Sequence, residues 1–189
     1  MAMRARIAAG LAVAVLGGCM RGPNPLPPPA VAPSGEFAKR IDAYLTLRRR
    51  VAATLPPRKE TDDAARLVER RKRLAAGIRA ARPDAPQGAI FTRDVEADFR
   101  QVVQEDIRAR APDDRAGVRK EVPRLSFAVN DEYPETKPLA TVPPKLLAKL
   151  PRLPEELQYR FFDRHLILLD VDANLIVDYI PDALPAAPA

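Results

Sequence analysis

Residues 153–185 read LPEELQYRFFDRHLILLDVDANLIVDYIPDALP, the most apolar stretch of the chain after its N-terminal leader. Three runs in this stretch are rich in β-branched and aromatic residues and predict strands: Gln158–Phe162, His165–Val171 and Leu175–Ile180. The breaks between them, Asp163-Arg164 and Asp172-Ala173-Asn174, contain Asp and Asn, which tolerate the left-handed backbone of tight turns. The stretch therefore predicts a three-stranded antiparallel meander.

A two-residue turn at 163–164 also predicts which side chains share a face of this sheet. Two sets result, one of Tyr159, Phe161, Leu166 and Leu168, the other of Phe162, Ile167, Leu169 and Val177. Both sets are mostly apolar, whereas a sheet with one wet face alternates apolar and polar residues. We therefore expect cover on both faces, from the protein's own helices or from a partner.

Three helices are predicted upstream, over Glu36–Leu55, over Asp62–Arg82 and from Arg93 to about Arg110. Ser34, Thr61 and Thr92 are their candidate N-caps. The expected inward faces are Phe37, Ile41, Leu45, Val51 and Leu55, then Leu67, Leu74 and Ile78, then Val95, Phe99, Val102 and Val103. The predicted fold class is α+β, with about three helices packed on a small C-terminal meander.

The domain organisation follows from changes in composition along the chain. We expect a lipoprotein signal peptide at 1–18, a proline-rich tether at 19–34, a helical region at 35–122, an irregular connector at 123–150 and the meander with its tail at 151–189. Residues 35–185 would form one domain. The tether sequence favours polyproline II, which rises about 3.1 Å per residue.

The leader carries the clearest functional signal. Arg4 and Arg6 precede an apolar run, Ile7–Leu16, that is too short for a permanent transmembrane helix. Leu-Gly-Gly then precedes Cys19, the only cysteine, as in the lipobox of bacterial lipoproteins, although an ordinary cleaved signal with a chance cysteine is the alternative. The sequence predicts lipidation of Cys19 and, because Met20 is not the Asp of inner-membrane retention, the periplasmic face of the outer membrane.

The strand stretch also carries a family resemblance. It resembles the C-terminal signature of a family of uncharacterised bacterial exported proteins and lipoproteins, and Leu74–Thr92 with Phe99-Arg100 resembles that family's helical region. The resemblance implies export and an α+β build, and no activity or catalytic residue. The run LILLDVDANLIVDYI is similar, more weakly, to the hairpin of the RcnB-type periplasmic fold, whose link to metal homeostasis is an analogy of shape.

Residues suited to catalysis are scarce. His165 is the only histidine, and Ser34 and Ser126 are the only serines, so a Ser–His–Asp arrangement would need Ser126 to meet His165. Phosphate-binding glycine loops, paired-cysteine sites and zincin motifs are not in the sequence. We therefore expect a protein that is not an enzyme and uses no cofactor.

The meander contains acidic and histidine side chains of the kind that bind divalent ions. Asp163, His165 and Asp170 are the weak metal candidates, beside Asp172 and Asp178. Their side chains divide between two faces and two ends of the sheet, so turn-forming aspartates and a strand-edge histidine are the preferred interpretation.

Charge is unevenly distributed. The chain is +6 overall, and Glu36–Arg82 holds 14 basic and 6 acidic residues. This half is suited to anionic head groups or acidic envelope polymers, unless it is only a solvated helix surface balanced by the acidic half. Nucleic acid is not expected, because the basic region has no aromatic platform.

Three charged residues interrupt the apolar helix faces: Arg48, Arg71 and Asp106. An unpaired charge facing a core is costly, so they are expected either to form one buried polar cluster or to reach outward to water. Together these features predict a cell-envelope lipoprotein that is a non-enzymatic binding or structural module, whose partner is an envelope protein or an acidic polymer. The alternative is a periplasmic metal-responsive or metal-binding protein.

Overall fold

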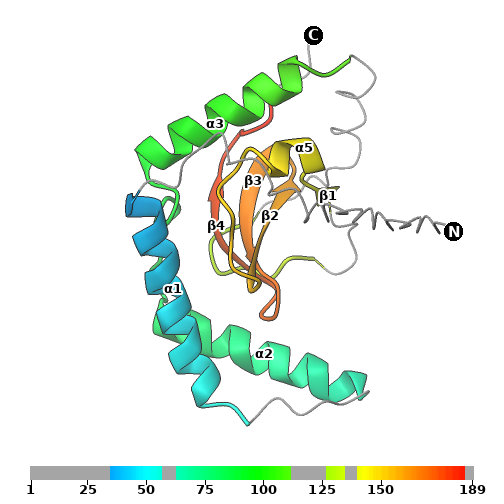
Figure 1. The fold of residues 1–189 in the computed structure, drawn as a ribbon. Coiled ribbons are helices and arrows are strands. Elements are labelled where there is room, and N and C mark those ends of the chain that lie inside the picture. Colours follow the sequence, from blue (N-terminus) through cyan, green and yellow to red (C-terminus); the bar gives the residue numbers. More distant parts are fainter. Residues whose placement is uncertain (1–34, 57–62, 112–126, 135–139, 186–189) are drawn as a thin grey trace, which may run out of the picture.

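The computed structural model describes residues 35–56, 63–111, 127–134 and 140–185. They form an α+β domain in which three main helices precede a C-terminal antiparallel sheet, as the sequence predicts (Figure 1). The predicted signal peptide, tether and lipidation site at Cys19 lie outside the described residues, as do Ser34, Thr61 and Ser126. None of the described helices combines the length and the hydropathy needed to cross a bilayer.

The meander is confirmed as β2 (Leu157–Phe162), β3 (His165–Asp170) and β4 (Leu175–Ile180). Asp163 and Asn174 have φ values of 52° and 53°, so the left-handed turns predicted from Asp and Asn are present. The connector, expected to be irregular, contributes a fourth strand, β1 (Ala140–Thr141), at the outer edge of β2.

One predicted face assignment is wrong. Leu168 pairs with Asp178 but Leu169 pairs with Ile176, so β4 has one extra residue, Val177, at a β-bulge. The bulge turns Val177 onto the face that holds Leu168, whereas unbroken alternation placed it with Leu169.

The main helices are α1 (Gly35–Ala53), α2 (Ala64–Ala81) and α3 (Arg93–Arg108), with a short α5 (Pro144–Leu147) in the connector. Their bounds lie within two residues of those predicted. Asp63, rather than Thr61, is the N-cap of α2, and its carboxylate accepts the backbone N–H groups of Ala65 and Arg66.

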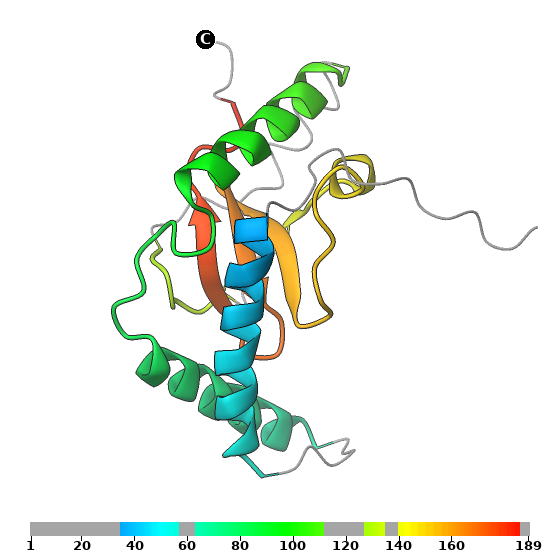
Figure 2. The same cartoon turned by 60° about the vertical axis from the view of Figure 1, so that its left-hand side comes forward.

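All three helices pack on one face of the sheet, which explains the apolar character of that face (Figures 1 and 2). Phe37, Phe91 and Phe99 meet there with ring centroids 5.3–5.9 Å apart, and Phe99 also contacts Tyr159. The expected inward position of Leu67 on α2 is wrong, because this side chain is 43% exposed.

The other face of the sheet is covered without a helix. Phe162, Ile167, Leu169 and Ile176 are buried there against Tyr133, with Phe127 packed beside them. Both aromatic residues come from segment 127–134, which is joined to the sheet by a bridge between Glu132 and Leu175. Both faces are therefore covered as expected, one by the helices and the other by part of the predicted connector.

Candidate functional site

A groove of about 600 Å³ lies between β2 and the connector segment that contains α5. Its walls are mainly apolar, formed by Pro144, Leu147, Leu150, Pro151, Leu153 and Leu157. β1 pairs only with Arg160 and Phe161, so the first half of β2 continues beyond its partner strand and borders the groove. The volume and the apolar lining are typical of sites that bind small molecules or peptide side chains.

Two polar groups that border this groove have buried atoms without hydrogen-bond partners in the described part of the chain. They are the hydroxyl of Tyr159, whose side chain is almost fully buried, and Nε of Arg160. Burial raises the pKa of Tyr159 far above its ordinary value, so the hydroxyl keeps its proton and remains a donor. Both atoms are shielded from solvent, and the ring of Tyr159 packs against Phe99 in the helix-covered core, so these two donors are not presented at the groove surface.

The described residues that line the groove are apolar or basic, apart from Gln158 and Tyr159. The described residues that line it include two arginines, Arg152 and Arg160, and no carboxylate, histidine, serine or cysteine. Acid–base or nucleophilic catalysis needs such groups within hydrogen-bond reach of a substrate. The arrangement instead offers an apolar surface with positive charge at its border.

The sequence-predicted metal candidates do not come together. Nε2 of His165 lies 4.0 Å from a carboxylate oxygen of Asp163, at the β2–β3 turn. Asp170 is at the opposite end of β3, where its carboxylate accepts the hydroxyl of Tyr44 at 2.7 Å and Nε of Arg48 at 2.8 Å. Over the described residues, no group of three or more His, Cys, Asp or Glu side chains is placed to hold a metal ion.

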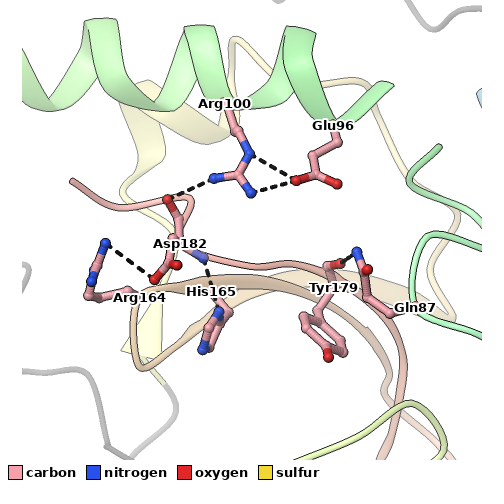
Figure 3. A network of polar contacts seen from close by, with 7 residues as sticks. All are labelled: Gln87, Glu96, Arg100, Arg164, His165, Tyr179 and Asp182. Atoms are coloured by element: carbon pink, nitrogen blue, oxygen red, sulfur yellow. Dashed lines mark hydrogen bonds and ion pairs between the residues drawn. The ribbon is translucent and has the colours of Figure 1, made fainter. Parts of the chain in front are cut away.

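His165 belongs to a polar network that joins the end of the sheet to α3 (Figure 3). Its Nδ1 accepts the backbone N–H of Asp182 at 3.0 Å, and the Asp182 carboxylate pairs with Arg164 at 3.2 Å. Arg100 of α3 donates to the backbone carbonyl of Asp182 and also pairs with Glu96. These contacts hold the segment that follows β4 against β3 and α3, so the network has a structural role.

The protonation of His165 is set mainly by its surroundings in this network. Phe127 and Tyr179 flank its ring at 5.3 and 5.9 Å. Burial lowers the pKa of His165, which the carboxylates of Asp163 and Asp182 only partly oppose. A neutral ring is also what the hydrogen bond from the Asp182 amide to Nδ1 requires.

The predicted cluster of Arg48, Arg71 and Asp106 is not formed. Arg48 and Asp106 are both buried, as the helix faces indicated, but they have separate partners. Arg48 pairs with Asp170 and with Asp172 in the sheet, at 2.8 and 2.5 Å, while Arg71 is half-buried on α2.

Asp106 instead pairs with Arg110, one turn later in the chain, and with Lys149 beyond α5, at 2.6 and 2.9 Å. Burial alone would raise the pKa of Asp106, but hydrogen bonds from Lys149 and Arg110 bring it below its ordinary value. The pairing of Asp106 with Arg110 could have been predicted from their i,i+4 spacing in the sequence, whereas Lys149 is 43 residues away and could not.

Asp178 is a structural site that sequence reasoning did not find. Its fully buried carboxylate accepts backbone N–H groups of Gly88, Ile90 and Phe91 at 2.7–2.8 Å. Gly88 has a φ of 84°, a conformation that glycine adopts without strain. An aspartate inside an otherwise apolar strand was the available signal that something must hold this charge.

Compared with protein-family models, curated proteins and solved structures, the chain shows no match. The resemblance to exported proteins therefore stays a prediction. The fold and the groove define the class: an α+β domain with an apolar, arginine-bordered groove at the edge of its sheet.

Proposed function

We propose that the protein is a cell-envelope lipoprotein whose domain is a non-enzymatic binding or structural module. The observation that carries the proposal is the leader sequence, in which Leu-Gly-Gly directly precedes Cys19 after a short apolar core. Lipidation of this cysteine with more than one acyl chain would give stable membrane attachment, since one chain alone gives only marginal binding. The proline-rich segment that follows is suited to a tether.

The groove beside β2 supports the binding part of the proposal. It combines an apolar lining with two arginines, Arg152 and Arg160, and no described residue that lines it is a carboxylate, histidine, serine or cysteine. The partner would be an envelope component with an apolar portion and acceptor oxygens, such as an extended protein segment. The periplasmic face of the outer membrane is the proposed location.

Metabolic labelling with a fatty-acid probe tests the anchoring. The full chain should label and sediment with membranes. Once its leader has been cleaved, the Cys19→Ala variant should neither label nor sediment. The neighbouring change Met20→Ala is the control and should label normally. The proposal fails if Cys19→Ala labels as strongly as the unchanged chain.

Site-specific photo-crosslinking tests the groove. A photoreactive residue at Leu147, which is exposed at the groove, should yield a discrete adduct in intact envelopes. The same residue at Ala97, an exposed position on α3, is the control. The groove is not the binding surface if both positions give the same products, or if Leu147 gives none.

A further inference from the structure

The N-terminal part of α2 extends beyond the rest of the domain. Every residue from Ala64 to Glu69 is exposed, and buried positions begin only at Leu74. Figure 1 shows this end of the helix projecting past its crossing with α1, far from α3. We name residues 64–73 the α2 arm. From Ala64 to Glu69 the helix exposes all its sides and so gains little from packing, whereas Arg70 donates to the backbone carbonyl of Pro56 after α1.

The arm is strongly basic. It carries Arg66, Arg70, Arg71, Lys72 and Arg73 against one acid, Glu69. The side chains of Arg66 and Arg73 are 74% and 57% exposed, and their ion pairs with Asp63 and Glu69 are solvent-exposed pairs that hold them weakly. The exposed Arg49 and Arg50 near the end of α1 add further positive charge on the neighbouring helix.

The same arm exposes apolar surface. Leu67 and Val68 are two of the few large apolar side chains exposed in the described part of the chain, at 43% and 40%. Leu67 is seven residues before Leu74, so it continues the stripe that packs against the core further along α2. Apolar side chains flanked by Lys and Arg on one helix are typical of helices that lie in the interface of a membrane.

We propose that the α2 arm lies on an anionic lipid leaflet, with Leu67 and Val68 at the boundary between head groups and acyl chains. This inference rests on the proposed function, which places the protein at a membrane. A lipid surface satisfies both properties of the arm, because phosphates attract the cations while the acyl region takes the apolar pair. A soluble acidic polymer would engage the charges alone.

The proposed anchor and the arm can reach one surface. The arm lies at the C-terminal end of α1, and 19 residues of α-helix span about 28 Å. The 15 residues of segment 20–34 would span about 46 Å as polyproline II. A lipid on Cys19 would therefore leave enough chain to begin α1 well above the membrane while the arm touches it.

An environment-sensitive fluorophore on the full chain in vesicles tests the inference. Lipidation consumes the only natural thiol, so Leu67→Cys provides a single labelling position, and Ala97→Cys on α3 is the control. We expect a blue shift at position 67 in vesicles of phosphatidylglycerol and phosphatidylcholine in equal parts, no shift in pure phosphatidylcholine, and reversal at about 1 M salt. Position 97 should not respond.

Charge variants provide the second readout. Each of Arg66→Gln and Lys72→Gln should weaken arm binding roughly fivefold, while Arg93→Gln, an exposed cation at the start of α3, should leave it unchanged. Equal emission from position 67 in both vesicle types overturns the inference. So does a shift with a soluble polyanion such as heparin and none with vesicles, which would assign the arm to an acidic polymer.

The intact mass of the same sample reports the state of Cys19 separately. If Cys19 is unmodified, the fluorescence test is repeated with Cys19→Ser added to preformed vesicles, so that binding of the arm is measured without an anchor. A failed lipidation and a failed arm contact are thereby distinguished.

Discussion

Asp178→Asn would test whether one buried carboxylate fixes the chain between α2 and α3. Each oxygen of Asp178 accepts two backbone N–H groups, those of Gly88 and Tyr179 on Oδ1 and those of Ile90 and Phe91 on Oδ2. Asparagine has the same shape but offers one acceptor oxygen. Its NH₂ group would face the other pair of N–H donors. Because the site is buried, water could not replace the lost acceptor.

The size of the effect follows from these contacts. Two backbone donors lose their acceptor, and each unmet buried donor costs about 1–3 kcal/mol, so the free energy of unfolding should fall by about 2–6 kcal/mol. For a domain of this size, each kcal/mol shifts the melting temperature by about 2–4 °C. Arg82, whose guanidinium feels the charge of Asp178, would lose part of its electrostatic support as well.

Urea unfolding followed by circular dichroism measures the change, with Asp98→Asn on the exposed side of α3 as the matched control. The control should stay within about 0.5 kcal/mol of the unchanged protein. Native-state hydrogen exchange should show the amides of Ile90 and Phe91 losing protection before the sheet does. Unchanged stability together with unchanged protection of these two amides would refute the assigned role of Asp178.

Three further outcomes are expected. Arg48→Met should destabilise the fold by about 3–5 kcal/mol because Asp170 loses its cation; Arg48→Met with Asp170→Leu should recover part of that in a double-mutant cycle, and strictly additive losses would show no coupling. Gly77→Ala brings a Cβ too close to the side chain of Val51 and should cost about 1–3 kcal/mol in the same urea assay; an unchanged midpoint would mean that the α1–α2 crossing relaxes freely. Burial holds the pKa of His165 below its ordinary 6.5, so the unfolded chain binds the proton first and stability should decrease as pH falls from 6.5 through the folded value; His165→Gln should flatten this dependence, and equal slopes would contradict it.

The sequence by itself determined the parts of the fold that depend on neighbouring residues. The three strands follow from runs of β-branched and aromatic residues, and the turns follow from Asp163 and Asn174, whose short polar side chains tolerate a positive φ. Helix periodicity likewise showed that Arg48 and Asp106 face inward. Each of these signals is contained within a few residues of chain.

Only the tertiary structure decided which distant groups meet. Arg48 pairs with Asp170, 122 residues away, and three of the four backbone donors to Asp178 lie about 90 residues before it. The bulge at Val177 and the pairing of β1 with β2 are likewise settled by how the segments pack. Such contacts depend on how all the segments of the domain pack together, because every buried charge needs a partner. A local sequence pattern does not contain this information.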